Sequence, residues 1–403
     1  MVAIASAGDR GFRGHKGLRE NYGGSFGGSF GGSFGGSFGG SFGGSFGGSF
    51  GGSFGGSFGG SFAAPLGNSS ASPTLNDGMN RFREGIFQPT IGIGYGVAKY
   101  LSVTGDQTDK LRKSSSSIHA YLILQELLSN TKIKASGKPS DIQLVSYAKS
   151  SATLIRPSLN AFKDQLQWVV DLHDLREDRG AEILSQSGML MPYLAQIIPI
   201  RPDRTPQTLV LIDALVQFCM FVHFRLKHDF SVPRPADLSP QVQALIPTPS
   251  HSSYPMGHAT EAYAAATLMD YLLTVACDAK TDKEAVLSEV RTQLYGFAYR
   301  VGFNRLVAGV HFPIDLIAGA HLGRFLGIEF IKTSFCVDKK SQSKIEHFVL
   351  ATETLSQSKL SELPQISKAI FKQTLKFEIP TASSQIAPTI SAVAVEEMLR
   401  LFA

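Results

Sequence analysis

The tetrapeptide Gly-Gly-Ser-Phe repeats ten times without interruption from Gly23 to Phe62, and this tract restricts any packed fold to the rest of the chain. Half of its residues are glycine, which loses the most conformational entropy on ordering, and the tract has too little apolar surface to form a core. We therefore expect residues 23–62 to be disordered, between a basic segment at residues 1–22 and a linker at residues 63–78. The evenly spaced phenylalanines suit weak self-association, and the alternative is a repeat that expanded without a selected role.

Apolar residues at three- and four-residue spacing predict helices through the remaining sequence. The predicted helices cover residues 118–128, 159–172, 208–226, 259–275, 286–299, 313–331 and 345–360. We find no convincing alternating pattern of the kind that strands produce. The sequence therefore predicts an all-α fold of one or two helical bundles at residues 79–375. A linker and an amphipathic segment follow at residues 376–403, and this segment would dock on the bundle or on a partner subunit.

Two clusters of residues can surround an anion with donors. Lys227 and Arg234 offer positive charge, and Pro255-Met256-Gly257-His258 leads into a predicted helix. The free N–H groups at a helix start attract anions, and Gly257 lets the backbone come close to one. His258, on the same turn, would give or take a proton.

A third cluster combines a cation with a candidate for bond formation. Arg305 supplies the cation, and His311 precedes Phe312-Pro313, where proline favours the first position of a helix. Asp315 would then lie in the first helical turn. Its carboxylate could accept the proton of one imidazole nitrogen of His311 and leave the other nitrogen free to face the anion.

The order and spacing of these clusters resemble a known signature. Six residues separate Lys227 from Arg234-Pro235, and Pro255-x-Gly257-His258 follows. Five residues separate Arg305 from His311, and three separate His311 from Asp315. This pattern is similar to that of the superfamily joining vanadium-dependent haloperoxidases, type 2 phosphatidic acid phosphatases and bacterial acid phosphatases. The resemblance implies a helical bundle of that type and a role for each matching residue. The oxyanion would be held by Lys227, Arg234, Gly257 and Arg305; His258 would be the acid and base; His311 would be the vanadate ligand or the phosphorylated nucleophile; Asp315 would orient His311; and Lys227 would also polarise bound peroxide.

Three positions bear on which activity the resemblance implies. Met256 replaces the serine usual between the proline and the glycine, so one hydroxyl donor to the oxyanion is missing. Asn304 replaces the serine that commonly precedes the arginine. His251 lies where bromoperoxidase-type members carry a histidine beside vanadate, and its alternative is a surface histidine in a loop. Met256 disfavours halide oxidation, whereas His251 favours it.

Three functions follow from these residues. The favoured one is a vanadate-dependent haloperoxidase that oxidises bromide or iodide with hydrogen peroxide. The alternative is a soluble acid phosphatase that hydrolyses a small phosphate ester through a phosphohistidine and needs no cofactor. In the third, the site has lost catalysis and the protein is an oxyanion-binding or assembly component. A homo-oligomer is left open.

Composition and apolar runs restrict the partners and the location. The net charge is +5, and no basic stripe with interleaved aromatic residues accompanies it, so we expect no nucleic-acid partner. Asp213, Gln217 and His223 interrupt the most apolar stretch, which predicts a buried helix in place of a membrane span. The N-terminus lacks an apolar run of signal-peptide length. We therefore expect a cytoplasmic protein without a transmembrane segment.

Overall fold

The computed structural model describes residues 114–135, 142–147, 150–188, 190–278, 284–335, 348–350 and 386–401. Within these residues the protein is mostly helical, which confirms the predicted class. The predictions for residues 1–22, for the repeat at residues 23–62 and for both linkers lie outside the described residues.

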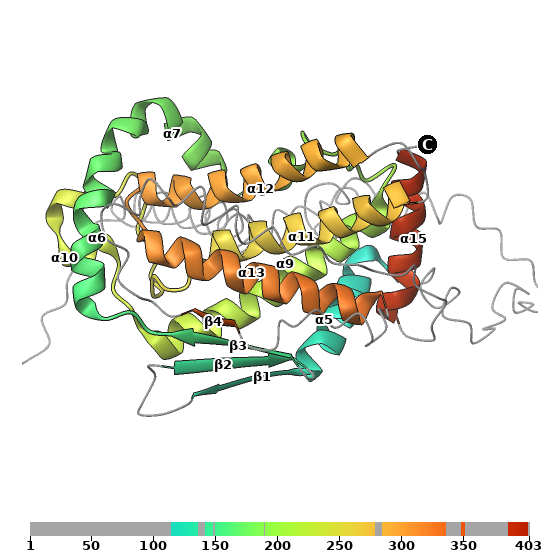
Figure 1. Ribbon diagram of the computed structural model, residues 1–403, viewed down its shortest axis with the longest axis horizontal. Coiled ribbons are helices and arrows are strands. Elements are labelled where there is room, and N and C mark those ends of the chain that lie inside the picture. Colours follow the sequence, from blue (N-terminus) through green and yellow to red (C-terminus); the bar gives the residue numbers. More distant parts are fainter. Residues whose placement is uncertain are drawn as a thin grey trace, which may run out of the picture.

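Four long helices run side by side along the molecule (Figure 1). They are α9 (Pro206–Phe230), α11 (Gly257–Asp278), α12 (Glu284–Val307) and α13 (Pro313–Ser334). Helix α11 contacts each of the other three, so it forms the centre of the bundle. Helix α5 (Ser116–Ser129) packs against α9. Each of these five helices contains one of the segments predicted from periodicity, because their apolar faces meet in a single core.

Helices α11 and α13 lie unusually close to each other. Three glycines of α13, spaced four residues apart, face the backbone of α11: a Cβ atom on Gly319 would lie 2.4 Å from the carbonyl oxygen of Met256, and one on Gly323 would lie 2.1 Å from that of Thr260. A Cβ on Gly327 would meet the carbonyl oxygen of Ala264 at 3.1 Å. The missing side chains therefore let two backbones approach, and this brings the first turns of both helices together.

The C-terminal helix α15 (Ile386–Leu401) stands across the end of the bundle (Figure 1). Its apolar side, including Ile390 and Met398, is buried against α9, α11 and α5. Its buried Glu397 accepts hydrogen bonds of 2.9 Å from the backbone N–H groups of Gln207 and Thr208. These groups lie in the first turn of α9, where helical N–H groups have no partner within the helix. The C-terminal segment thus docks on the bundle.

Shorter elements cover the opposite end of the bundle. Helix α6 (Leu159–Asp171) continues through η3 (Leu172–Leu175) into α7 (Arg176–Ser185), which packs against α12. A short helix α8 (Met191–Leu194) follows α7, and α10 (Pro235–Leu238) and η4 (Pro240–Val242) follow α9. Figure 1 shows α6 and α10 at the end away from α15, with α7 beside α12.

A four-stranded sheet corrects the expectation of helices alone. Strands β1 (Thr131–Ala135), β2 (Ile142–Tyr147) and β3 (Ser150–Ile155) are antiparallel neighbours, and β4 (Phe348–Leu350) pairs with β3 in parallel. The helix predicted at residues 345–360 is therefore wrong at residues 348–350, and its remainder lies outside the described residues. Strands this short give little periodic signal, and the parallel pair joins segments almost 200 residues apart in the chain.

Helix α9 corrects the predicted location. The segment Pro206–Leu238, which contains α9, is long and apolar enough to cross a membrane. Asp213 is the only acid in its apolar stretch, and Gln217 and His223 do not make that stretch polar enough to exclude a span. Of the most apolar window, 67% is buried inside the structure. The prediction of a cytoplasmic protein, which depended on the absence of any such segment, is therefore wrong as argued.

Candidate functional site

The residues of the three clusters lie at helix ends that meet on one side of the bundle. Lys227 is in the last turn of α9, Arg234 is the N-cap of α10, Gly257 and His258 open α11, Arg305 is in the last turn of α12, and His311 and Asp315 flank the start of α13. Such ends carry free N–H or C=O groups, so charged side chains gather there naturally.

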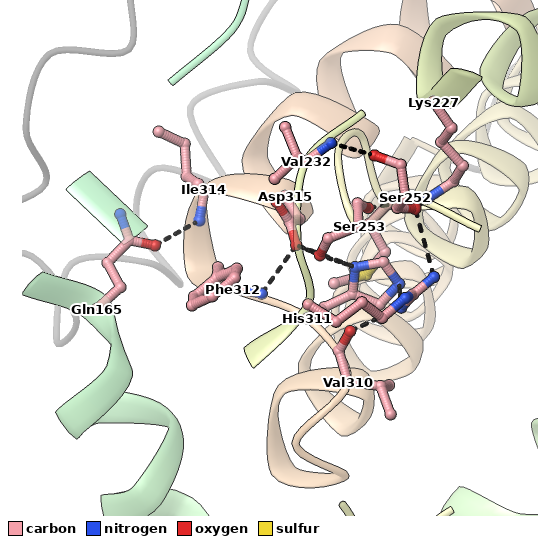
Figure 2. Close-up of polar contacts among 12 residues, drawn as sticks. Gln165, Lys227, Val232, Ser252, Ser253, Val310, His311, Phe312, Ile314 and Asp315 are labelled. Atoms are coloured by element: carbon pink, nitrogen blue, oxygen red, sulfur yellow. Dashed lines mark hydrogen bonds and ion pairs between the residues drawn. The ribbon is translucent and has the colours of Figure 1, made fainter. Parts of the chain in front are cut away.

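His311 is held by a carboxylate and a hydroxyl (Figure 2). Its Nδ1 lies 3.0 Å from Oδ2 of Asp315 and 3.2 Å from Oγ of Ser253. The same Oδ2 accepts the backbone N–H of Phe312 at 2.9 Å and a hydrogen bond from the Ser253 hydroxyl. The carboxylate of Asp315 therefore both caps the N-terminus of α13 and orients the imidazole of His311. A carboxylate at Nδ1 favours the tautomer in which Nδ1 carries the proton and Nε2 has the lone pair.

The other ring nitrogen of His311 faces a cation. Its Nε2 lies 3.1 Å from Nη1 of Arg234, which also donates to the carbonyl oxygen of Val310 at 2.7 Å. Burial lowers the pKa of His311 well below its usual range, and the charges of Arg234 and Lys227 lower it further. The imidazole is therefore neutral, and the lone pair on its Nε2 faces the positive charge of Arg234.

Arg234 joins His311 to the preceding loop. Its Nε donates to the carbonyl oxygen of His251 at 3.0 Å, and its Nη2 lies 3.1 Å from Nδ1 of the same residue. Burial and the charges of Lys227 and Arg234 lower the pKa of His251 to about 3, so its Nδ1 can accept from the guanidinium. The half-buried ring of His251 also packs edge-on against Phe224, with 5.0 Å between ring centroids. His251 thus contacts the site, in contrast to its alternative as a surface histidine.

Lys227 is buried against the loop that carries Ser252 and Ser253. Its Nζ donates to the carbonyl oxygens of Ser252 and Ser253 at 2.9 and 2.8 Å (Figure 2). Burial lowers its pKa well below the usual range, and Arg234 lowers it further, whereas Asp315 and Glu261 oppose this change. An anion beside Lys227 would restore the pKa, because opposite charge favours the protonated amine.

Gly257 lies against a second histidine. A Cβ on Gly257 would be 2.9 Å from Cε1 and 3.0 Å from Nε2 of His223, so the imidazole occupies the space that a side chain would need. The Nε2 of His223 lies 3.0 Å from Oε1 of Glu261, and both residues are buried. Burial raises the pKa of Glu261 to about 8, although Lys227 counteracts it. The structure therefore adds a packing reason for glycine at this position.

His258 follows Gly257 on the first turn of α11. Its Nε2 is buried and has no partner among the described residues, while the backbone of Gln186 favours a proton on the ring. Burial lowers the pKa of His258 to about 3, and the charge of Arg305 contributes next. The neutral imidazole therefore presents Nε2 as a proton acceptor.

Arg305 is oriented by α7. Its Nη2 donates to the carbonyl oxygen of Ile183 at 2.7 Å and its Nη1 donates to Oγ of Ser187 at 3.0 Å. Its Nε is buried and has no partner within the described part of the chain. Burial lowers the pKa of Arg305 to about 10, so the guanidinium stays charged at neutral pH.

Met256 and Asn304 contribute less directly. The side chain of Met256 is fully buried and offers no donor, while its backbone N–H donates to the carbonyl oxygen of Asp315 at 3.0 Å. Asn304 is turned toward α7, where its Nδ2 donates to Oε1 of Gln186 at 2.9 Å. The structure therefore places Asn304 beside the residues that support the site, while Met256 connects the starts of α11 and α13 through its backbone.

Reasoning from the sequence missed four kinds of contact: the hydroxyl of Ser253, the carbonyl groups that bind Lys227, the buried pair of His223 and Glu261, and the turn at the end of α7. Ser253 stands in a serine-rich loop where no spacing distinguishes it. Glu261 lies one turn after Gly257 and just before an apolar run of α11, and an acid in such a place was a usable signal. Among the described residues, no group of three or more His, Cys, Asp or Glu side chains could hold a metal ion.

Comparison with known proteins identifies a family for part of the chain. Residues 208–336 match the family model described as the PAP2 superfamily, and the match contains all three clusters. The resemblance seen in the sequence is thereby confirmed over this region. Members of this superfamily are generally enzymes, either phosphatases or haloperoxidases, and are often associated with membranes. No curated protein matches the chain.

Proposed function

Because residues 208–336 belong to the PAP2 superfamily, we propose that the protein is an enzyme that holds a tetrahedral oxyanion against Nε2 of His311. We propose further that the oxyanion is vanadate and that the activity is the oxidation of bromide or iodide by hydrogen peroxide. The observation that carries the first step is the neutral His311, whose Nδ1 is bound by Asp315 and whose Nε2 faces Arg234.

The donor set fits such an anion. Lys227, Arg234 and Arg305 supply charge, and the first turn of α11 supplies free N–H groups. Two buried nitrogens, Nε of Arg305 and Nε2 of His258, have no partner among the described residues, and a buried polar atom without a partner costs free energy. Bound vanadate would act as a Lewis acid that activates hydrogen peroxide toward halide.

His311 would provide the bond to the central atom. Asp315 keeps the proton on Nδ1 and orients the ring, while Ser253 holds the carboxylate from the other side. Arg234 lies next to Nε2 at 3.1 Å, so its charge would stabilise an oxyanion bonded there.

His258 would accept and return the proton that moves during the reaction. Its Nε2 carries a lone pair in the resting state, so it can take up the proton that hydrogen peroxide loses on binding and return it later in the reaction. Lys227 would polarise bound peroxide from behind the loop, once the anion has raised its pKa. The protein's contribution is therefore positional and electrostatic.

The contact between His251 and Arg234 favours the haloperoxidase. His251 is half-buried beside Arg234, one of the cations that would hold the oxyanion. It can accept or supply a hydrogen bond near the place where halide would approach. Met256 weakens the case, because its thioether gives no hydrogen bond where the superfamily usually has a hydroxyl. We expect this loss to cost roughly 1–3 kcal/mol of anion affinity.

The general character of the superfamily favours a second candidate, a phosphatase. The Nε2 of His311 would bond to phosphorus as the bond from phosphorus to the leaving oxygen breaks. His258, protonated once the dianionic substrate has raised its pKa, would give its proton to that oxygen. Water would then attack the phosphohistidine and release phosphate, with the proton of the water returning to Nε2 of His258.

Parallel assays separate the two candidates. Purified full-length protein, with and without orthovanadate, would be tested for peroxide- and bromide-dependent halogenation of a 1,3-diketone and for hydrolysis of an aryl phosphate. Vanadate-dependent halogenation that is lost in His311→Ala supports the haloperoxidase. Hydrolysis that vanadate inhibits, without halogenation, replaces it with the phosphatase. No activity in either assay contradicts both and leaves an oxyanion-binding or assembly protein.

A further inference from the structure

The turn that ends α7 is built around the guanidinium of Arg305. The Ile183 carbonyl accepts Nη2, the Ser187 hydroxyl accepts Nη1, and this hydroxyl donates to the same Ile183 carbonyl at 3.0 Å. The three groups form a closed set of hydrogen bonds around one side of the guanidinium. The carbonyl belongs to the last turn of α7, where helical C=O groups lack partners and the negative end of the dipole favours a cation.

The same turn also contacts His258. The backbone of Gln186 favours a proton on the ring of His258, and the ring nitrogen Nε2 is buried without a partner among the described residues. A backbone carbonyl can only accept, so beside Nδ1 it would favour the tautomer in which Nδ1 carries the proton. The residue directly after α7, Gln186, would thus fix the tautomer of the proposed acid and base.

The side chain of Gln186 ties this turn to α12. Gln186 is 1% exposed, and its Oε1 accepts from Asn304 at 2.9 Å while its Nε2 donates to Glu182 at 2.9 Å. Glu182 in turn bridges to Arg300 of α12 at 2.7 Å. Because Asn304 directly precedes Arg305, these bonds hold the turn beside the backbone that carries the guanidinium.

Glu182, Ile183, Gln186 and Ser187 all lie before residues 208–336, the region that matches the superfamily. The bonds from Ile183 and Ser187 to Arg305 span 122 and 118 residues of chain. The matched region therefore contains the candidate reacting groups but lacks part of the structure that aims two of them.

We propose that the segment Glu182–Ser187 is a positioning element of the active site: Ile183 and Ser187 aim Arg305 at the oxyanion, and Gln186 holds His258 in the tautomer that accepts a proton at Nε2. The inference rests on the proposed function for the identity of the anion. The segment binds the outer nitrogens of Arg305 and leaves Nε, and it binds Nδ1 of His258 and leaves Nε2. The two atoms left without partners are those that can serve a ligand.

Ser187 gives the sharpest test, because a neighbouring serine provides a matched control. Ser185 lies on the same turn, and its hydroxyl bonds to the carbonyl groups of Ala181 and Glu182 and to the hydroxyl of Tyr193. Neither Arg305 nor His258 is among these hydrogen-bond partners of Ser185. In full-length protein, Ser187→Ala should raise the dissociation constant of orthovanadate about tenfold, the usual effect of losing a bond to a charged group.

The controls separate aiming from folding. Ser185→Ala should leave the dissociation constant unchanged, and Ser187→Thr, which restores a hydroxyl, should recover most of the lost affinity. Thermal unfolding would show that all three variants are folded. Equal affinities for Ser187→Ala, Ser185→Ala and the unchanged protein, all folded, would overturn the role of Ser187.

The tautomer of His258 gives a readout that needs no ligand. Nitrogen NMR of full-length protein labelled at histidine, with His258→Gln to identify the signal, should show a proton on Nδ1 and none on Nε2. A proton on Nε2 would overturn the role of Gln186. If the unchanged protein binds neither orthovanadate nor phosphate, the proposed function fails, and the tautomer alone then decides for or against the positioning role.

Discussion

The two sides of the candidate site are built in different ways. On one side, His311 is oriented by Asp315, four residues further along the same chain segment, and by Ser253 in the adjoining loop. On the other side, Arg305 is oriented by Ile183 of α7 and by Ser187, 122 and 118 residues earlier in the chain, and the turn after α7 also lies beside His258. The acid that orients the candidate nucleophile or ligand lies on the same chain segment, whereas the groups that orient the cation Arg305 lie 118 and 122 residues away.

The difference teaches where the site should tolerate change. The His311 side depends on the start of α13, so it should persist wherever α13 keeps its cap. The Arg305 side depends on how α7 packs against α12 and can therefore vary with that packing. Substitutions on the His311 side should abolish the reaction, whereas substitutions on the Arg305 side should weaken anion binding and proton transfer.

The largest effect should follow from Asp315→Asn, which tests the His311 side. An amide donates to Nδ1 where the carboxylate accepts, so the proton moves to Nε2 and the lone pair no longer faces the anion. We expect a loss of about 100-fold or more in kcat/KM for whichever activity is found. Steady-state kinetics would measure it, and a loss below about threefold would remove Asp315 from its assigned role.

Glu261→Gln tests the buried pair that lies between the two sides. Burial raises the pKa of Glu261 to about 8, well above the usual range of a glutamate, so the folded state favours its protonated form. Its contribution to stability is therefore full below about pH 4.5 and is lost as pH rises through about 8. Glutamine cannot ionise, so the variant should lose about 4 kcal/mol less stability than the unchanged protein between pH 5 and 9. Denaturant titrations at each pH would give the free energy of unfolding of both proteins. If the two free energies changed with pH by the same amount, the prediction would be contradicted.

Gly257→Ala tests the packing of α11 against α9. Its Cβ would lie 2.9 Å from the imidazole of His223, whose position is fixed by Glu261. We expect a loss of about 2 kcal/mol in the free energy of unfolding, together with weaker anion binding. Gly296→Ala is the matched control, because a Cβ there meets nothing within 4 Å and alanine favours a helix. Equal stability for both variants would show that His223 can move aside.

The smallest effect is expected from Ser253→Ala. The variant removes one donor to Asp315, while the backbone N–H of Phe312 and Nδ1 of His311 remain bound to the same oxygen. We expect about 1 kcal/mol, or roughly a fivefold fall in kcat/KM with little change in KM. A fall as large as that of Asp315→Asn would mean that Ser253 has a further role.

The sequence predicted the helices well because helical periodicity is a local property. Helix α13 begins at Pro313, as the proline and the aspartate two residues later predict. The motif also identified the residues that meet at the helix ends. The β3–β4 pair, the bonds from α7 to Arg305 and the contact between His223 and Gly257 were not predicted, because each joins distant segments through packing that no local pattern encodes.

The most direct test of the central claim is the binding of orthovanadate to His311, followed by vanadium NMR on full-length protein. The protein should bind one vanadate per chain, His311→Ala should lose this binding, and His321→Ala, a change further along the same helix, should keep it. Equal binding by the unchanged protein and His311→Ala would contradict the account, because the anion would then be held without the nitrogen around which the site is built.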